Sequence, residues 1–141
     1  MAIEKLNPYL NFNGTAAKAI EHYRSVLGAS VDQISRFGDV PDMQVPADQK
    51  DRIMHAALRI GNDTLMVCDT MQNEGVTFGS NVHLVLHFDD ADDMTKKFDA
   101  LAAGGKVTMP LNDTFWGARF GMLEDAFGVR WMFNHDLKKK A

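Results

Sequence analysis

The side chains in this sequence best able to do chemistry include a histidine and a cysteine within apolar runs. His55 lies in the run 53–60, where an imidazole could act as a general base near neutral pH. We favour the alternative, a strand histidine hydrogen-bonded to its sheet. Cys68 could be a nucleophile, but the sequence places no cation or helix N-terminus beside it to lower its pKa. A buried, inert thiol is the better interpretation of Cys68.

An aromatic and a basic residue, Trp116 and Arg119, form another candidate pair. Stacking on the indole and a bidentate contact from the guanidinium could hold an aromatic or anionic ligand. Trp116 could equally fill a seam between subunits or between two halves of the fold. The sequence contains no glycine-rich phosphate loop, Cys-x-x-Cys pair or nucleophile elbow.

Hydrophobic periodicity predicts the elements that carry these residues. In the first half, apolar residues at three- and four-residue spacing predict a helix over 16–27, with Thr15 as its N-cap and Gly28 as its C-terminal stop. Residues 38–51 contain two prolines and no period, so we expect a loop, either a lid or a surface connection. Strands are expected at residues 5–12, 30–37, 53–60 and 64–69.

The second half repeats this order of elements. A helix is expected over 91–103, capped by Asp89 or Asp90 and ended by a pair of glycines. Strands are expected at residues 81–88, 106–111, 115–123 and 129–134. We interpret the repeat as one duplicated βαβββ unit. The predicted fold class is therefore α+β, with a single domain over 1–141 made of module one, about 1–75, and module two, about 76–141.

Each predicted module is too small to bury both faces of its sheet. The physical solution is to place the helices on the outer face and to curve the mixed sheet into a cup around a shared hollow. Side-chain alternation along the strands gives the inward-facing residues. They combine apolar and hydrogen-bonding groups, as small-molecule pockets do. The predicted ligand-binding residues are Tyr9, Asn11, His55, Met66, Cys68, His83, His87, Trp116, Arg119, Met132 and Asn134.

Several segments resemble the vicinal oxygen chelate superfamily, which includes glyoxalases, bleomycin-resistance proteins and dioxygenases, and in particular its PhnB-like branch. They are NPYLNF at 7–12, HYRSVLG at 22–28, LMVCD at 65–69, TFWGAR at 114–119 and DAFGVRW at 125–131. The last segment has Ala126 where the family often has proline. The resemblance implies paired βαβββ modules with one cup per pair, usually in a dimer.

The resemblance also implies where a metal would bind, because metal-using members take ligands from the first and last strands of each module. His83 matches one such position. Two others fall at Met132 and near Met66, and the remaining one at Asn7 or Pro8. Thioether sulfur suits soft Cu(I) rather than Mg²⁺, Mn²⁺ or Fe²⁺. We therefore predict no metal site and no cofactor.

Three classes of function follow. The first, which we favour, is binding of a small molecule in the cup without a complete metal site. The second is a metal-dependent lyase, isomerase or dioxygenase of the glyoxalase type. The third is a metal-free enzyme that uses His55, His83 or Arg119 as acid, base or oxyanion clamp. The fold does not choose among them, because one cup hosts many reactions.

The bulk properties narrow the partners and the compartment. The net charge of −4 argues against a nucleic-acid partner, because phosphates require a basic face. The sequence shows no apolar stretch long enough for a membrane span and no signal peptide. With one cysteine and no internal disulfide, a cytoplasmic location is expected. Sheet edges that need cover, together with the resemblance, lead us to expect a homodimer.

Overall fold

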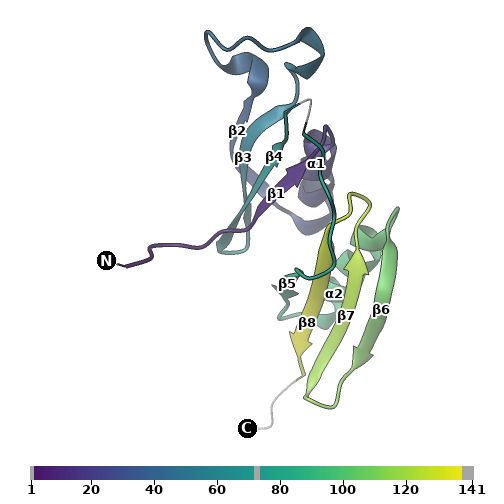
Figure 1. The fold of residues 1–141 in the computed structure, drawn as a ribbon. Coiled ribbons are helices and arrows are strands. Elements are labelled where there is room, and N and C mark those ends of the chain that lie inside the picture. The colour runs from purple at the N-terminus through teal and green to yellow at the C-terminus, as the bar shows by residue number, and fades with distance from the viewer. Residues whose placement is uncertain (1, 72–73, 138–141) are drawn as a thin grey trace. The chain divides into compact units, whose positions relative to one another are not determined.

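The computed structural model describes residues 2–71 and 74–137. The chain divides into two compact units, Met1–Thr77 and Phe78–Ala141, called module one and module two below. Module one contains β1 (Tyr9–Phe12), α1 (Ala16–Leu27), β2 (Ser30–Arg36), β3 (Ile53–Ile60) and β4 (Asp63–Asp69). Module two contains β5 (Leu84–His87), α2 (Ala91–Ala102), β6 (Lys106–Asp113), β7 (Ala118–Glu124) and β8 (Arg130–Asp136). The predicted βαβββ order therefore occurs in both modules (Figure 1).

Each module forms its own four-stranded mixed sheet, and the strand order is the same in both. Module one has the order β1-β4-β3-β2 and module two the order β5-β8-β7-β6. The first strand of each module pairs in parallel with the last, whereas the other pairs are antiparallel. The α+β class and the duplicated topology are confirmed, and neither sheet closes on itself. The cup shared by the two modules stays a prediction.

In module one, α1 covers one face of the sheet. Its buried residues Ala16, Ala19, Ile20 and Tyr23 recur at three- and four-residue spacing, which is why the helix has an apolar face. The strand residues buried on the same side alternate along the chain, as in Leu65 and Val67 of β4. The helix ends at Gly28, which adopts the left-handed conformation at φ 72° that glycine takes without steric cost.

The predicted N-cap of α1 is wrong in its chemistry. Thr15 occupies the N-cap position but makes no capping hydrogen bond with its side chain. The carboxylate of Asp69, at the end of β4, performs this function instead. Its Oδ1 accepts from the backbone N–H of Gly14 at 2.7 Å and of Ala16 at 3.0 Å, and its Oδ2 accepts from Ile53 N–H at 2.9 Å. Asp69 therefore ties the helix start to two strands.

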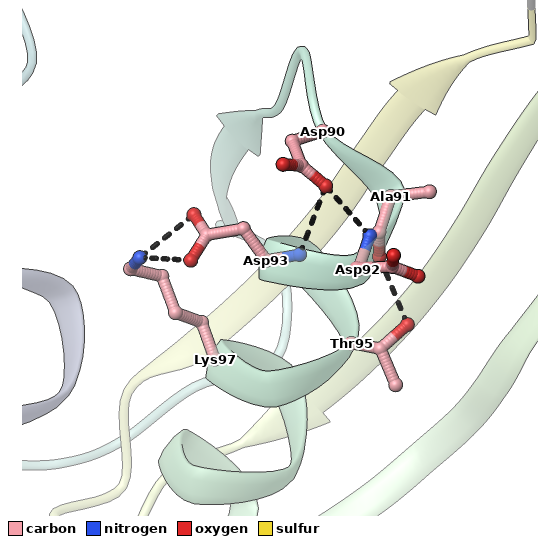
Figure 2. Close-up of polar contacts among 6 residues, drawn as sticks. All are labelled: Asp90, Ala91, Asp92, Asp93, Thr95 and Lys97. Atoms are coloured by element: carbon pink, nitrogen blue, oxygen red, sulfur yellow. Dashed lines mark hydrogen bonds and ion pairs between the residues drawn. The ribbon is translucent and has the colours of Figure 1, made fainter.

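The second helix has the local cap that its sequence predicts. Figure 2 shows the carboxylate of Asp90 accepting hydrogen bonds from the backbone N–H groups of Asp92 and Asp93, at 2.9 and 3.2 Å. One turn later, Lys97 Nζ pairs with Asp93 at 2.6 Å across an i,i+4 spacing. Of the two predicted caps, Asp89 and Asp90, the structure selects Asp90.

The core of module two lies between α2 and the sheet. Met94, Phe98 and Leu101 of α2 are buried together with Trp131 and Phe133 of β8. The Phe98 and Phe133 rings meet edge to face, with centroids 5.1 Å apart. The same side of β7 carries Gly121, where a Cβ would meet the Phe98 ring at 3.0 Å. The helix packs closely on β7 because this position has no side chain.

Several predicted strand boundaries are wrong. β1 begins at Tyr9 rather than residue 5, and β5 begins at Leu84 rather than residue 81. The strand expected from residue 115 starts at Ala118, because Thr114 and Gly117 close a turn in which Gly117 N–H donates to Thr114 O at 3.3 Å. The loop at 38–51 contains 3₁₀ turns at Phe37–Asp39 and Ala47–Gln49. Within the described residues, no helix has the length and apolar character needed to span a membrane.

Candidate functional site

The face of the module one sheet that points away from α1 collects five of the predicted ligand-binding residues. The β1–β4 register pairs Tyr9 with Met66 and Asn11 with Cys68. His55 shares the side of Ala57, which pairs with Met66 in β3–β4. We call this surface the helix-free face of module one and define it by Tyr9, Asn11, His55, Met66 and Cys68. Each of these side chains is half-buried or exposed.

The central contact on this face joins Tyr9 of β1 to His55 of β3 across the intervening strand β4. Tyr9 Oη lies 2.6 Å from His55 Nδ1, and the two rings meet edge to face with centroids 5.6 Å apart. Burial raises the pKa of the Tyr9 hydroxyl, and the charge and hydrogen bond of Cys68 raise it further. Tyr9 therefore keeps its proton. An imidazole nitrogen is a better acceptor for the hydrogen bond of this hydroxyl than a neutral thiol is.

Cys68 is held in the same network as a thiol. Its Sγ–H donates to Asn11 Oδ1 at 3.0 Å, and Asn11 Nδ2 donates to the Tyr9 carbonyl at 3.3 Å. Burial raises the pKa of the Cys68 thiol above its ordinary 9.0. The hydrogen bond of Tyr9 lowers this pKa, and the negative charge of Asp69 raises it further. The thiol is half-buried. This environment disfavours the nucleophilic thiolate.

Cys68 is accordingly expected to alkylate slowly. At about pH 8, iodoacetamide should react with the folded protein more slowly than with the same protein in urea, and the pH midpoint of the reaction should lie above that of an ordinary thiol. Because the folded state holds this proton longer than the unfolded state, stability should fall as the pH rises from about 9 through the folded pKa. A folded-state midpoint below that in urea would identify an activated thiolate and contradict this expectation.

The corresponding face of module two carries a different hydrogen-bonded group beside apolar residues. The β5–β8 register pairs Val85 with Met132 and His87 with Asn134, all on the side opposite Trp131 and Phe133. Asn134 Nδ2 lies 3.2 Å from His87 Nδ1 and 3.2 Å from an oxygen of Asp136. The predicted residues His87, Met132 and Asn134 thus come together on one face, which we call the helix-free face of module two.

The other three predicted residues lie apart from these groups. His83 precedes β5. Trp116 lies in the turn before β7, with its ring 5.1 Å from that of Phe115 and 5.8 Å from that of Phe120. Arg119 pairs with His135 in the β7–β8 register, which places it on the opposite side from Phe120. The predicted grip by Trp116 and Arg119 is therefore not assembled.

The residues at the metal positions implied by the resemblance do not fit a hard divalent cation. Met66 and Met132 offer thioethers, and the amide of Asn7 donates to the Thr64 carbonyl at 3.1 Å. Within neither module do three His, Cys, Asp or Glu side chains of the described residues gather to hold a metal ion. Mg²⁺ and Mn²⁺ prefer several carboxylate and carbonyl oxygens, whereas these positions supply two thioethers, the imidazole of His83 and, at Asn7, a single amide oxygen.

The sequence identified Tyr9 and His55 separately but missed their pairing. The only signal was their shared side-chain parity, which does not reveal which strands are neighbours. Neighbouring strands of a sheet lie about 5 Å apart. The side chain of Tyr9 on β1 can reach β3 because only one strand, β4, lies between them.

Comparison with known proteins places this chain in a family. The sequence model of the Glyoxalase/Bleomycin resistance protein/Dioxygenase superfamily matches residues 5–133. Protein YjdN of Escherichia coli is 36% identical, over 92% of this chain and 93% of that protein. Among solved structures, protein PA1353 of Pseudomonas aeruginosa is 40% identical with a TM-score of 0.85, over 96% of this chain and all of that one.

A PhnB protein from Bacillus cereus, titled a putative 3-demethylubiquinone-9 3-methyltransferase, is 26% identical with a TM-score of 0.79, over 94% of this chain and 99% of that one. The predicted resemblance, including its PhnB-like aspect, is confirmed. By its sequence and its repeated βαβββ topology, the chain belongs to the glyoxalase/bleomycin resistance protein/dioxygenase superfamily.

Proposed function

We propose that this protein binds a small organic molecule on the helix-free face of module one, without a resident hard divalent cation. The observation that carries the proposal is the hydrogen-bonded group formed by Tyr9, His55, Asn11 and Cys68 on one strand face, beside Met66. It sets a few oriented polar groups against apolar and sulfur surface, the usual composition of a small-molecule site.

A second candidate is a metal-free enzyme, and the contact between Tyr9 and His55 favours it specifically. With the Tyr9 hydroxyl donating to Nδ1, the imidazole presents Nε2–H, which can donate a hydrogen bond to an oxyanion that develops in a substrate. Binding remains the first candidate, because the neighbouring Cys68 is held as a thiol rather than as a nucleophile.

The proposal is tested on protein purified without added metal. Elemental analysis is expected to find well under one equivalent of Mg²⁺, Mn²⁺, Fe²⁺, Ni²⁺ or Zn²⁺. A chelator should leave the melting temperature unchanged, because a metal bound only by the folded state would stabilise it by mass action. If the protein instead held stoichiometric metal, and His83→Ala lost both the metal and stability, the metal-dependent enzyme would become the preferred function.

The binding half of the proposal is tested on the same preparation. Mass spectrometry of the acid-released supernatant is expected to find a small molecule enriched over a mock purification. Its amount should fall in Tyr9→Phe and His55→Leu but not in Lys18→Gln, a substitution on the exposed side of α1. Equal amounts in all four preparations would locate the molecule elsewhere on the protein and overturn the proposed site.

A further inference from the structure

The contact between Tyr9 and His55 fixes which atom the imidazole offers to a ligand. Tyr9 Oη lies 2.6 Å from Nδ1, and a hydroxyl that keeps its proton donates it to this nitrogen. A neutral imidazole that accepts at Nδ1 carries its hydrogen on Nε2. The site then presents an N–H donor at His55 Nε2.

The surroundings of this donor favour a neutral acceptor over an anion. The cation on the same strand side, Arg59, is already paired with Asp32 at 3.1 Å. The two acids beside His55, Tyr9 and Cys68, both resist ionisation because burial raises the pKa of each. A ligand carboxylate or phosphate would meet the same unfavourable desolvation, and the Arg59 guanidinium already has Asp32 as its partner. A carbonyl oxygen accepts one hydrogen bond and brings no charge.

The other groups on this face restrict the body of the ligand. Tyr9 exposes 43% of its surface, and Met66 lies directly beside it in the β1–β4 register. An aromatic ring and a thioether together favour a flat, apolar or aromatic body, through ring stacking and sulfur–ring contact.

Resting on the proposed function and naming its ligand class, we propose that the helix-free face of module one binds a neutral carbonyl compound with a flat apolar body, whose oxygen accepts a hydrogen bond from His55 Nε2–H. For this hydrogen bond Tyr9 is a positioning residue, because its hydroxyl acts through the imidazole, while its ring contacts the body of the ligand directly.

The tautomer is tested directly by ¹⁵N NMR of the histidine side chains at about pH 8, where histidine is ordinarily neutral. His55 is expected to show a protonated Nε2 and an unprotonated Nδ1. In Tyr9→Phe this preference should be lost toward a mixture of tautomers, while the other assigned histidines remain unchanged. A protonated Nδ1 in the wild-type protein would overturn the proposal, because the imidazole would then present an acceptor.

Ligand class is tested with three matched probes, followed by ¹⁹F NMR titration. They are 4′-fluoroacetophenone, which carries a neutral carbonyl, 1-ethyl-4-fluorobenzene, which lacks the acceptor, and 4-fluorobenzoate, which is anionic. The ketone is expected to bind about 2- to 12-fold more tightly than either of the others, the range of one net hydrogen bond. Amide shifts in β1, β3 and β4 should report the ketone at this face.

Variants then assign the preference to the imidazole. His55→Leu should reduce the affinity for the ketone to that for the ethylbenzene, and His55→Gln, which retains an N–H donor, should recover part of the difference. His22→Gln, on the helix that covers the opposite face of the sheet, is the matched control and should bind as wild type. Saturable binding of ketone and ethylbenzene with equal affinity would sink the carbonyl proposal but leave the binding function standing. If none of the probes binds at this face, the carbonyl site is refuted. The proposed function is then still tested by mass spectrometry of the acid-released supernatant.

Discussion

Replacing Asp69 by alanine is expected to lower the free energy of unfolding of module one by about 3–5 kcal/mol, because two buried backbone donors and one part-buried donor lose their acceptor, at about 1–3 kcal/mol for each buried one. The carboxylate is 3% exposed and binds the N–H groups of Gly14, Ala16 and Ile53. No neighbouring side chain of α1 replaces it, since Thr15 makes no capping hydrogen bond. Urea unfolding followed by circular dichroism measures the loss.

Two variants and a second measurement make this test specific. Asp69→Asn keeps one acceptor oxygen but presents an amide N–H₂ to a backbone N–H, so an intermediate loss is expected. Asp63→Ala, at the exposed start of the same strand, should change stability by no more than about 0.5 kcal/mol. In Asp69→Ala, the backbone amides of α1, β3 and β4 should exchange their hydrogens faster than in the wild-type protein. A loss in Asp69→Ala no greater than in Asp63→Ala would mean that other acceptors replace the carboxylate.

The sequence predicted the helices well because their signals are local. The bounds of α1 agree with the prediction, and α2 ends one residue early, at Ala102. Each has an apolar face of helical period, a polar residue before it and glycine after it. Strand ends were less accurate, since turns such as the one closed by Thr114 and Gly117 are set by specific hydrogen bonds that alternation does not reveal.

Long-range polar contacts could not be predicted, because nothing local specifies them. Asp69 looks like the end of a strand, yet it caps a helix that begins 53 residues earlier, at Ala16. Tyr9 and His55 are 46 residues apart and meet only because β4 lies between their strands. Alternation predicted only that Tyr9 faces the inward side of its strand, and the strand order supplied its contact with His55. The individual site residues were therefore accessible from the sequence, whereas their partners required the topology.

The two helix-free faces differ in chemistry although the modules share a topology. In each module the first strand pairs in parallel with the last. At equivalent positions of this pair, Asn11 lies beside Cys68 in module one and His87 lies beside Asn134 in module two. Only module one adds a phenol–imidazole contact across its central strand. This asymmetry is the reason for assigning the ligand's hydrogen bond to module one.

In module two, Asp125→Ala is expected to cost about 3–5 kcal/mol of unfolding free energy. The side chain of Asp125 is 2% exposed and accepts from Phe127 N–H at 2.8 Å, Val129 N–H at 3.0 Å and Trp131 Nε1–H at 2.8 Å. It closes the turn before β8 and holds the indole in the core, so its loss removes this acceptor from two buried donors and one part-buried donor.

A double-mutant cycle isolates the indole contact within that total. Trp131→Phe removes the N–H donor, and its effect should be smaller by about 1.5–3 kcal/mol in the Asp125→Ala background, the usual worth of a hydrogen bond to a charged group. Asp99→Ala, on the exposed side of α2, is the control and should leave stability within about 0.5 kcal/mol of wild type. Additive losses in the cycle would show that the carboxylate acts only on the backbone of the turn, and that packing alone holds Trp131 in place.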